Sequence, residues 1–216
     1  FIKSNLSYIK GDLYYAASPD TDANANKIID FVRGIDVFDE NLNGKTNDER
    51  WKLGDIYHSQ IAIVGPPSAH STSTNTYTES YYRQSNQYDN FKQANKNRKT
   101  FILAGANDGM LHAFDSLTGD EIWAFIPPSV IPNLRNMVSS KANSSNSIYA
   151  VDGSPVVKDI YYNNKWRTVV IAGLGRGGHS YFALDITDID NPKHLFTFDN
   201  DPSLKIIQYW NSDGLK

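Results

Sequence analysis

The sequence predicts an all-β protein built from β-propeller blades, each a four-stranded antiparallel sheet. The first observation is the stretch 101–125, FILAGANDGMLHAFDSLTGDEIWAF, in which two tight turns separate three short strand-like runs. The second is an internal repeat, because residues 181–185 (YFALD) follow the same pattern as residues 111–115 (LHAFD). Short strands joined by tight turns and repeated along a chain are typical of a propeller.

Residues 1–50 are predicted to lead into the first blade through a short helix. Thr21 or Asp22 can cap the N-terminus of this helix, and Gly34 can end it. Its apolar side chains are Ile28, Ile29, Phe31 and Val32. Residues 36–50 are polar, and we expect them to form turns.

The first blade is predicted at residues 51–126, with an opening strand at 56–64 followed by the three strands of 101–125. Residues 66–98 interrupt this blade with a segment rich in Ser, Thr, Asn, Gln and Tyr. Because such a segment cannot bury a core of its own, we expect a long loop or insertion here.

The second blade is predicted at residues 150–200, after a short helix near 129–138 and a linker rich in Ser and Asn. Residues 204–216 are expected to open a third blade. Two blades cannot close a ring, since known propellers need about four to eight. We therefore expect residues 1–216 to form part of one propeller domain, about two blades of a larger ring.

Composition and charge exclude several classes of function. The 21 basic and 24 acidic residues give a net charge of −3, which is not the basic footprint of a protein that binds nucleic acid or an anionic membrane surface. No apolar run approaches the roughly 20 residues that span a bilayer. The absence of cysteine excludes disulfides, thiolate metal sites and a cysteine nucleophile.

The segment 39–49 (DENLNGKTNDE) presents oxygen donors at the spacing that Ca²⁺ prefers. Asp39, Asn41 and Asn43 take positions 1, 3 and 5 of a loop, and Gly44 allows the sharp turn at position 6. The residues that could hold the ion are Asp39, Asn41, Asn43, Lys45, Asn47 and Asp48.

The later positions of this loop depart from an EF-hand. Lys45 would contribute only its backbone carbonyl, and Asn47 or Asp48 would close the site. Arg50 stands where an EF-hand has its bidentate Glu. With only one or two carboxylates, we expect weak binding, with a Kd of about 10⁻⁴–10⁻³ M. The alternative is a polar Asn-Gly turn that binds no metal.

Two further motifs favour structural roles. Residues 113–123 resemble the tryptophan-docking repeat of quinoprotein propellers, in which Asp115 caps a turn, Gly119 adopts a positive φ and Trp123 packs on the next blade. A quinoprotein enzyme would also need an acidic cluster in its central channel, and the sequence identifies none. Residues 173–178 (GLGRGG) have the form G-x-G-x-x-G, but strand-like residues follow them, which favours a glycine-rich hairpin over a nucleotide site.

Three segments together resemble one known family. They are residues 49–59 (ERWKLGDIYHS), 104–114 (AGANDGMLHAF) and 173–188 (GLGRGGHSYFALDITD). The family is that of the PilC/PilY-type adhesins of type IV pili, and the resemblance is to their C-terminal β-propeller domain. It covers about residues 28–200.

This resemblance implies a non-enzymatic type IV pilus biogenesis factor and pilus-tip adhesin of a Gram-negative bacterium. Such a protein would be secreted to the cell surface, at the pilus tip or in association with the outer membrane. It would support pilus assembly, oppose retraction and attach the cell to surfaces or host cells. The implied partners are minor pilins of the tip complex and a host-cell receptor. Residues 66–98 are the best candidate for adhesive surface, because long loops on a rigid scaffold commonly carry recognition.

The resemblance also implies Ca²⁺ as a ligand. Members of the family bind Ca²⁺ in loops of the type D-x-D-x-N-x-x-x-D, and calcium tunes their retraction and adhesion. Asp39, Asn41 and Asn43 match the first three ligand positions, with Asn replacing Asp at the second. The ninth position is Asn47, and Asp48 follows it. Two alternatives stay open: a quinoprotein dehydrogenase that uses pyrroloquinoline quinone (PQQ), and a scaffold propeller without calcium dependence.

Overall fold

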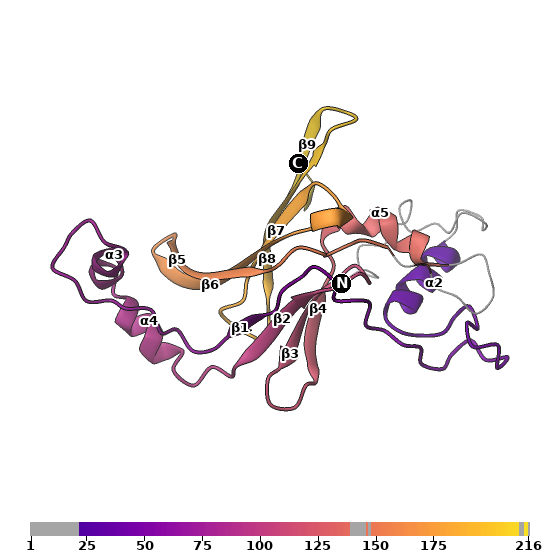
Figure 1. The fold of residues 1–216 in the computed structure, drawn as a ribbon, viewed down its shortest axis with the longest axis horizontal. Coiled ribbons are helices and arrows are strands. Elements are labelled where there is room, and N and C mark those ends of the chain that lie inside the picture. Colours follow the sequence, from indigo (N-terminus) through magenta and orange to yellow (C-terminus); the bar gives the residue numbers. More distant parts are fainter. Residues whose placement is uncertain (1–21, 139–145, 147, 212–213, 216) are drawn as a thin grey trace.

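Two antiparallel β-sheets are the main elements of the protein, as seen in a computed structural model that describes residues 22–138, 146, 148–211 and 214–215 (Figure 1). The first sheet has the strand order β1-β2-β3-β4, and the second has the order β10-β9-β8-β7-β6-β5. The strands of the first sheet are β1 (Ala62–Val64), β2 (Phe101–Gly105), β3 (Leu111–Asp115) and β4 (Glu121–Phe125). Those of the second are β5 (Val156–Tyr162), β6 (Lys165–Gly173), β7 (Ser180–Asp185), β8 (Lys193–Asp201), β9 (Ile206–Asn211) and β10 (Gly214–Leu215).

The predicted internal repeat is present in the pairing of the strands. β2 pairs with β3 so that Leu103 lies opposite Ala113, and β6 pairs with β7 so that Ile171 lies opposite Ala183. The next strand pair has a β-bulge in each sheet, directly after Ala113 in the first and after Ala183 in the second. The two sheets therefore share both register and irregularity, as expected of repeated blades.

The two sheets differ in extent. The first has the four antiparallel strands predicted for a blade, whereas the second has six. β9 lies in the segment expected to open a third blade, but it pairs with β8 along its whole length, from Ile206 opposite Asp201 to Asn211 opposite Phe196. Residues 206–211 therefore extend the second sheet.

The predicted opening strand at residues 56–64 is shorter than expected, because only β1 is a strand. The residues before β1 make their hydrogen bonds with loops. The N–H of His58 donates to the Asp152 carboxylate at 3.1 Å, and the N–H of Gln60 donates to Ser154 Oγ at 3.0 Å. Asp152 and Ser154 lie in the loop before β5. Their side chains thus satisfy backbone N–H groups that a neighbouring strand would otherwise satisfy.

The predicted helix near the N-terminus is α2 (Asp22–Val32). Its apolar residues Ile28, Ile29, Phe31 and Val32 are all buried. Gly34 has a φ of +93° and follows the last turn, as predicted for a helix stop, whereas Thr21 lies outside the described residues. The predicted helix near 129–138 is a run of short helical pieces: η3 (Pro128–Val130), α5 (Ile131–Leu134) and η4 (Arg135–Met137).

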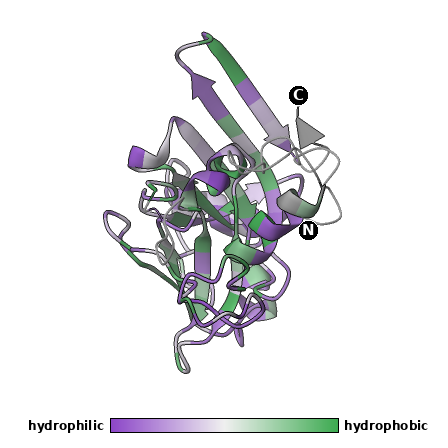
Figure 2. Cartoon of the chain, turned by 90° about the vertical axis from the view of Figure 1, so that its right-hand side faces the viewer, coloured by the Kyte–Doolittle hydropathy of each residue, from purple (hydrophilic) through white to green (hydrophobic). Residues whose placement is uncertain are grey.

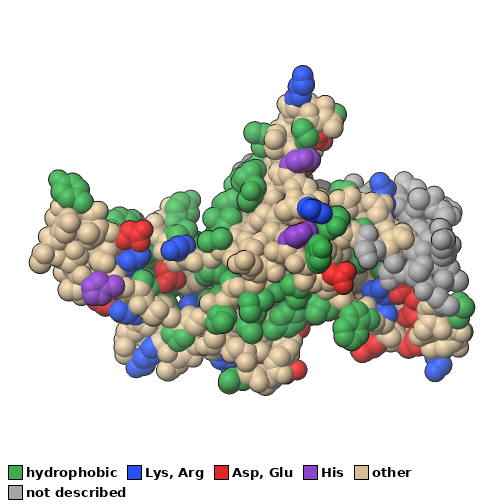
Figure 3. Space-filling model, viewed as in Figure 1, with side chains coloured by type: hydrophobic (Ala, Val, Ile, Leu, Met, Phe, Trp, Pro, Cys, Tyr) green, Lys and Arg blue, Asp and Glu red, His purple; other side chains and the backbone are tan. Residues whose placement is uncertain are grey.

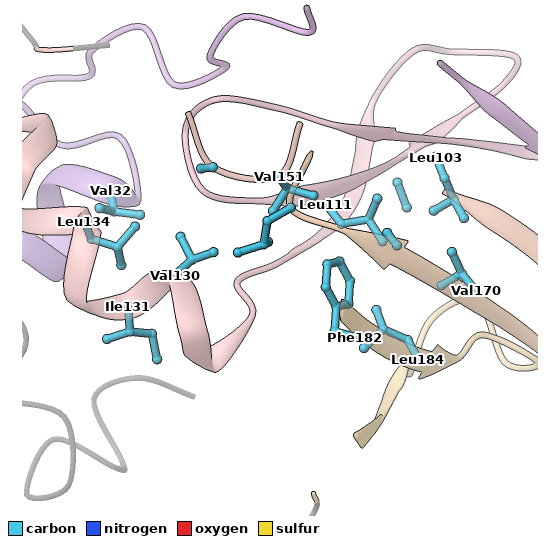
Figure 4. Close-up of a cluster of buried hydrophobic side chains, with 14 of the residues drawn as sticks. Val32, Leu103, Leu111, Val130, Ile131, Leu134, Val151, Val170, Phe182 and Leu184 are labelled. Atoms are coloured by element: carbon cyan, nitrogen blue, oxygen red, sulfur yellow. The ribbon is translucent and has the colours of Figure 1, made fainter. Parts of the chain in front are cut away.

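One hydrophobic core joins these elements. It combines α2 and α5 with the facing sides of both sheets, and Figure 4 shows Leu111, Val151 and Phe182 meeting between the sheets while Val32 and Leu134 meet between the helices. Apolar stretches concentrate in the strands, and most of the loops are hydrophilic (Figure 2). The burial of this shared core fixes the two sheets against each other.

Residues 66–98, predicted to be a long loop or insertion, lie between the paired strands β1 and β2 and are partly helical. They contain two helices, α3 (Glu79–Ser85) and α4 (Tyr88–Ala94), and form an arm that projects beside the β5–β6 hairpin (Figure 1). Thr78 caps α3 by accepting the N–H of Tyr81 at 3.2 Å. Tyr88 is fully buried, so this polar segment does bury an aromatic side chain against the second sheet. We call residues 66–98 the arm.

One face of the second sheet carries exposed apolar side chains. Val156, Ile171, Tyr181 and Tyr209 are all exposed, and apolar side chains are visible beside the β8–β9 hairpin in Figure 3. In a propeller every blade packs between two neighbours, so a face of this kind is expected where a further blade would lie.

Candidate metal-binding loop

The predicted calcium segment follows α2 and forms a loop whose two ends are joined. Ile35 and Glu49 form an isolated antiparallel bridge, and the N–H of Asp36 donates to the carbonyl of Asp48 at 2.8 Å. The ends of the loop are therefore fixed, and residues 39–48 lie within a closed turn of the backbone.

Two charged residues that the sequence analysis did not select hold this loop against α2. The buried Asp36 carboxylate accepts hydrogen bonds from the N–H groups of Glu40 (2.8 Å) and Asn41 (3.4 Å). The guanidinium carbon of Arg50 lies 3.9 Å from the centroid of the Phe31 ring, and Arg50 Nε donates to Glu40 at 2.7 Å. Arg50, at the position of the EF-hand glutamate, is therefore a structural anchor.

Asp39 and Gly44 form the turn at the start of the predicted site. The N–H of Gly44 lies 3.1 Å from each carboxylate oxygen of Asp39 and donates to them. Gly44 has a φ of +78°, which glycine adopts without strain, and Asp39 has a φ of +50°. The Asp39 carboxylate, at position 1 of the loop, is thereby bonded to the sharp turn at Gly44, position 6.

Asn41 and Asn43 connect this turn to Asp48. Their amide oxygens accept the N–H of Asn43 (3.0 Å) and of Lys45 (2.8 Å), respectively. Their amide nitrogens donate to Asp48 Oδ2, at 3.5 Å from Asn41 and 2.6 Å from Asn43. The side chains of Asn41 and Asn43 thus both contact the carboxylate of Asp48, the third predicted ligand.

Asp48 lies at the centre of this arrangement. The hydrogen bond from Asn43 holds the pKa of the Asp48 carboxyl below its ordinary value, with smaller contributions from Asn41 and the charge of Lys45, so Asp48 is ionised at neutral pH. Its other oxygen, Oδ1, is buried and has no hydrogen-bond partner among the described residues. Buried polar atoms are nearly always paired, so this oxygen is an exception among the described residues.

The donor chemistry of the loop fits a hard cation. Carboxylate and amide oxygens are the ligands that Ca²⁺ prefers, and rotation of the Asn41 and Asn43 amides would bring oxygen in place of nitrogen toward Asp48. Within the described ranges, no group of three or more His, Asp or Glu side chains is placed to hold a metal. Only two of the predicted ligands, Asp39 and Asp48, are carboxylates, so binding of Ca²⁺ by the loop would be weak.

The remaining predicted ligands, Lys45 and Asn47, do not bring their side chains into this arrangement of hydrogen bonds. Lys45 and Asn47 are exposed, and the side chain of Asn47 makes no hydrogen bond to any residue that the structure describes. Of the two residues predicted to close the site, Asp48 is therefore the one that the loop places beside Asn41 and Asn43.

The three motif segments of the sequence meet at the junction between the two sheets. Gly54 donates its N–H to the Asp108 carboxylate at 2.8 Å, and a Cβ on Gly54 would lie only 2.5 Å from the Asp108 nitrogen. His58 Nδ1 lies 2.6 Å from the buried Asp152 carboxylate. A Cβ on Gly177 would lie 1.9 Å from the Ala150 carbonyl oxygen. The glycines of these motifs therefore allow backbone segments to pack closely against one another.

His112 is a buried ionic centre of this junction. Its Nδ1 lies 2.6 Å from Glu121, and its Nε2 lies 3.0 Å and 3.1 Å from the two oxygens of Asp108. Burial alone would lower the pKa of His112, but the hydrogen bonds and charges of Asp108 and Glu121 outweigh it and raise the pKa above its ordinary value. Both ring nitrogens can then donate, as in an imidazolium.

The docking repeat and the glycine-rich motif have the structural roles that the sequence predicts. Trp123 Nε1 donates to the carbonyl of Ile189 at 2.8 Å, which links the first sheet to the loop after β7. Asp115 accepts the N–H of Leu117 at 2.8 Å, and Gly119 has a φ of +78°. The glycine-rich motif forms a short 3-10 turn, η5 (Gly175–Gly177), followed by strand β7. No helix N-terminus receives a phosphate there.

The chain is similar to known proteins over most of its length. A model of the PilY1 beta-propeller domain matches residues 53–202. The type IV pilus biogenesis factor PilY1 of Pseudomonas aeruginosa (strain UCBPP-PA14) is 35% identical over 204 residues, which are 93% of this chain and 17% of that protein. A PilY1 homolog of Xylella fastidiosa (strain Temecula1) is 37% identical over 78% of this chain and 13% of its own length. The crystal structure of the C-terminal domain of Pseudomonas aeruginosa PilY1 is 36% identical and covers 65% of this chain and 26% of that chain, with a TM-score of 0.47.

The two antiparallel sheets with their repeated strand register, together with this family match, define a segment of a β-propeller domain. The chain belongs to the PilY1 β-propeller domain family. It spans less than a fifth of the length of the curated relatives that it matches. In the part of the chain that the structure describes, no helix has the length and apolar character required to cross a bilayer.

Proposed function

We propose that the protein containing this chain is a type IV pilus biogenesis factor that acts without catalysis at the cell surface. The curated relatives, named as type IV pilus biogenesis factors, support this role. So does the structural use of Trp123 and His112, which link strands and loops at the junction between the sheets. The propeller stands at the pilus tip or on the outer membrane, binds minor pilins, supports assembly and opposes retraction.

The loop at residues 39–48 binds Ca²⁺ and thereby tunes this function. The observation that carries the calcium proposal is Asp48 Oδ1, a buried carboxylate oxygen without a partner among the described residues. Asp48 and Asp39 would supply charge, and Asn41 and Asn43 would supply amide oxygens. A bound cation stabilises only the ordered loop, so occupancy of the site raises the stability of that conformation by mass action.

Attachment to surfaces or to a host-cell receptor is the second part of the proposed role. The arm supports it, because its helices project from the sheets on a rigid base. This arrangement provides a surface that differs from the core of the propeller and can be altered without disturbing the calcium loop.

The test combines calcium binding with pilus assays on the whole protein. Asp48→Asn and Asp39→Ala are compared with Asp120→Asn, which changes an exposed turn residue far from the loop in sequence. Calorimetry is expected to show binding at about 10⁻⁴–10⁻³ M, weakened at least about tenfold in the two loop variants and unchanged in the control. Cells carrying the loop variants are expected to show altered surface piliation in calcium-containing medium.

The alternatives predict other outcomes. A scaffold propeller without calcium dependence predicts no calcium binding, or binding that all three variants retain. Cells that assemble and retract normal pili without the protein would overturn the role in biogenesis. The PQQ-dependent dehydrogenase is set aside in favour of the pilus role, because the curated relatives are named as biogenesis factors.

A further inference from the structure

An open groove of about 500 Å³ lies between the arm and the β5–β6 hairpin, and this volume falls within the usual size of small-molecule sites. One wall comes from the end of α3 and the start of α4, and the other comes from the hairpin turn and the first residues of β6. The two walls are far apart in sequence, so the groove exists only because the arm is docked (Figure 1).

The docking of the arm is strong enough to keep these walls in place. The Tyr88 hydroxyl donates to the Asp159 carboxylate, which also accepts a hydrogen bond from Thr168 Oγ1 at 2.7 Å. Arg98 Nη1 donates to the same Thr168 hydroxyl at 2.7 Å. Burial raises the pKa of the Tyr88 hydroxyl, with the neighbouring Asp159 adding to the shift, so Tyr88 stays a donor at neutral pH. This network fixes α4 on strands β5 and β6.

Trp166 joins the two walls directly. Its Nε1 donates to the carbonyl of Asn86 at 2.7 Å, and its ring lies 4.7 Å from the Tyr88 ring and 5.4 Å from the Tyr161 ring, centroid to centroid. Trp166, Tyr161 and Phe91 are only partly buried and line the groove. They give it an aromatic surface.

The polar part of the groove consists mainly of side-chain amides. They are Asn86, Gln87, Asn90 and Asn164. Asn90 donates one amide N–H to Gln87 Oε1 at 3.0 Å, which leaves the other amide groups of this pair available. The Asn164 side chain makes no hydrogen bond to any described residue. Lys165 is the one charged side chain among the described residues that line the groove.

Two of these amide residues, Gln87 and Asn164, lie at backbone positions with positive φ, one on each wall. Gln87 has a φ of +56° between α3 and α4, and Asn163 and Asn164 have φ values of +49° and +58° in the hairpin turn. Two successive residues with positive φ are typical of a tight type I′ turn.

We propose that this groove binds a neutral saccharide. A sugar ring has hydroxyl groups that both donate and accept, which suits amides that do the same, and an apolar C–H face, which suits aromatic rings. A phosphorylated or nucleic-acid ligand would need several cations, and Lys165 is a single one. The saccharide would be the surface ligand of the adhesive role proposed above, so its biological meaning rests on that role while the binding itself does not.

The test uses the whole protein and defined oligosaccharides. Chitotetraose represents wall-type polymers, lacto-N-tetraose represents neutral animal glycans, and sialyllactose is the anionic comparison. Asn164→Gly removes a lining amide but keeps a residue that adopts positive φ, and Asn163→Gly is its matched control in the same turn, outside the groove. Gln87→Gly removes the amide on the other wall under the same constraint.

We expect one of the neutral tetrasaccharides to bind, and the better one identifies the source of the ligand. Asn164→Gly and Gln87→Gly should each weaken binding about three- to tenfold, the effect of one or two neutral hydrogen bonds, whereas Asn163→Gly should not. The proposal is overturned if neither neutral sugar binds, if binding survives both lining substitutions, or if only sialyllactose binds and Lys165→Gln abolishes this.

Cell assays separate this proposal from the pilus role. Cells carrying Asn164→Gly should assemble normal pili and attach less well to a surface coated with the bound sugar. Saccharide binding by the protein with unchanged attachment would support the groove and overturn its adhesive meaning. Normal piliation in cells that lack the whole protein would overturn the biogenesis role and leave the groove supported.

Discussion

The loop at residues 39–48 and the arm at residues 66–98 are both polar segments, but they acquire their structure in opposite ways. In the loop, the contacts that build the site join near neighbours in sequence, such as Asn43 and Asp48. In the arm, the decisive contacts join Asn86 to Trp166 and Tyr88 to Asp159. Local spacing therefore encodes the loop, whereas the arm depends on a surface made by strands that follow it.

The two regions also differ in what stabilises them. The loop residues are mostly exposed, and hydrogen bonds between polar groups at the surface contribute little net free energy. The arm buries Tyr88 completely and packs several aromatic rings around Trp166. Removing a contact should therefore have a much larger effect in the arm than in the loop.

The largest expected effect is that of Trp166→Ala. It removes the ring between Tyr82, Tyr88 and Tyr161 and leaves the Asn86 carbonyl without its donor, so the free energy of unfolding should fall by about 3–5 kcal/mol. Hydrogen exchange should show loss of protection in α3 and α4 before the sheets open.

Trp51→Ala is the matched control for that substitution. Trp51 is 82% exposed, and its indole bonds only a nearby carbonyl, that of Leu53. Its replacement should change the free energy of unfolding by less than about 1 kcal/mol. Equal effects of the two substitutions, or an arm that stays protected without Trp166, would show that the arm is not held by its aromatic cluster.

The second effect concerns His112 at the junction of the sheets. His112→Gln should lower the free energy of unfolding by about 1–3 kcal/mol, because it leaves the buried Asp108 carboxylate without its charged partner. Since the pKa of His112 is raised in the folded state, the stabilisation it provides is complete below the unfolded pKa near 6.5 and is lost as the pH rises through the folded value.

The pH dependence separates this ionic role from packing. Chemical unfolding of the wild type between pH 6 and pH 9 should show stability falling with pH, and His112→Gln should flatten this slope. His70→Gln, at an exposed position in the arm, should leave the slope unchanged. A slope that persists without His112 would assign the dependence to other groups.

The same contrast explains how much of the fold could be predicted. The helix α2, the meander of β2, β3 and β4, and the repeat that places bulges after Ala113 and Ala183 all follow from local patterns of apolar residues and turns. The shortened opening strand could not be predicted, because His58 and Gln60 bond to side chains of a distant loop. Likewise, nothing local to residues 206–211 distinguishes a new blade from an extension of the second sheet.

The candidate site divides in the same way. The spacing of Asp39, Asn41 and Asn43 predicted residues that the structure does bring together with Asp48 or onto the same turn. Asp36 and Arg50 were missed because their partners, the N–H groups after a turn and the Phe31 ring, are defined only once the loop folds against α2. An acidic residue two positions after the helix stop Gly34 was the one signal in the sequence that pointed to Asp36.

The third effect is that of calcium itself. If the loop binds with a Kd near 1 mM, then 10 mM Ca²⁺ should raise the free energy of unfolding by about 1.4 kcal/mol. The protection should appear in residues 36–50, as slower proteolysis and hydrogen exchange, and not in the arm. The same concentration of Mg²⁺ should do less, since Mg²⁺ gives up its water reluctantly. Equal protection of the arm and the loop would indicate a general effect of salt.

The smallest effect comes from two glycines in the same environment. Gly44 in the loop and Gly119 in the β3–β4 hairpin both have a φ of +78°, and a Cβ at either position would meet no atom within 4 Å. Gly44→Ala and Gly119→Ala should therefore each lower the free energy of unfolding by about 1 kcal/mol, the strain of an alanine at positive φ. Calcium should distinguish them, because the strain of Gly44→Ala would shift the backbone N–H that holds the Asp39 carboxylate. Gly44→Ala should weaken calcium binding, measured by calorimetry, and Gly119→Ala should leave it unchanged; equal affinities would remove Asp39 and its turn from the site.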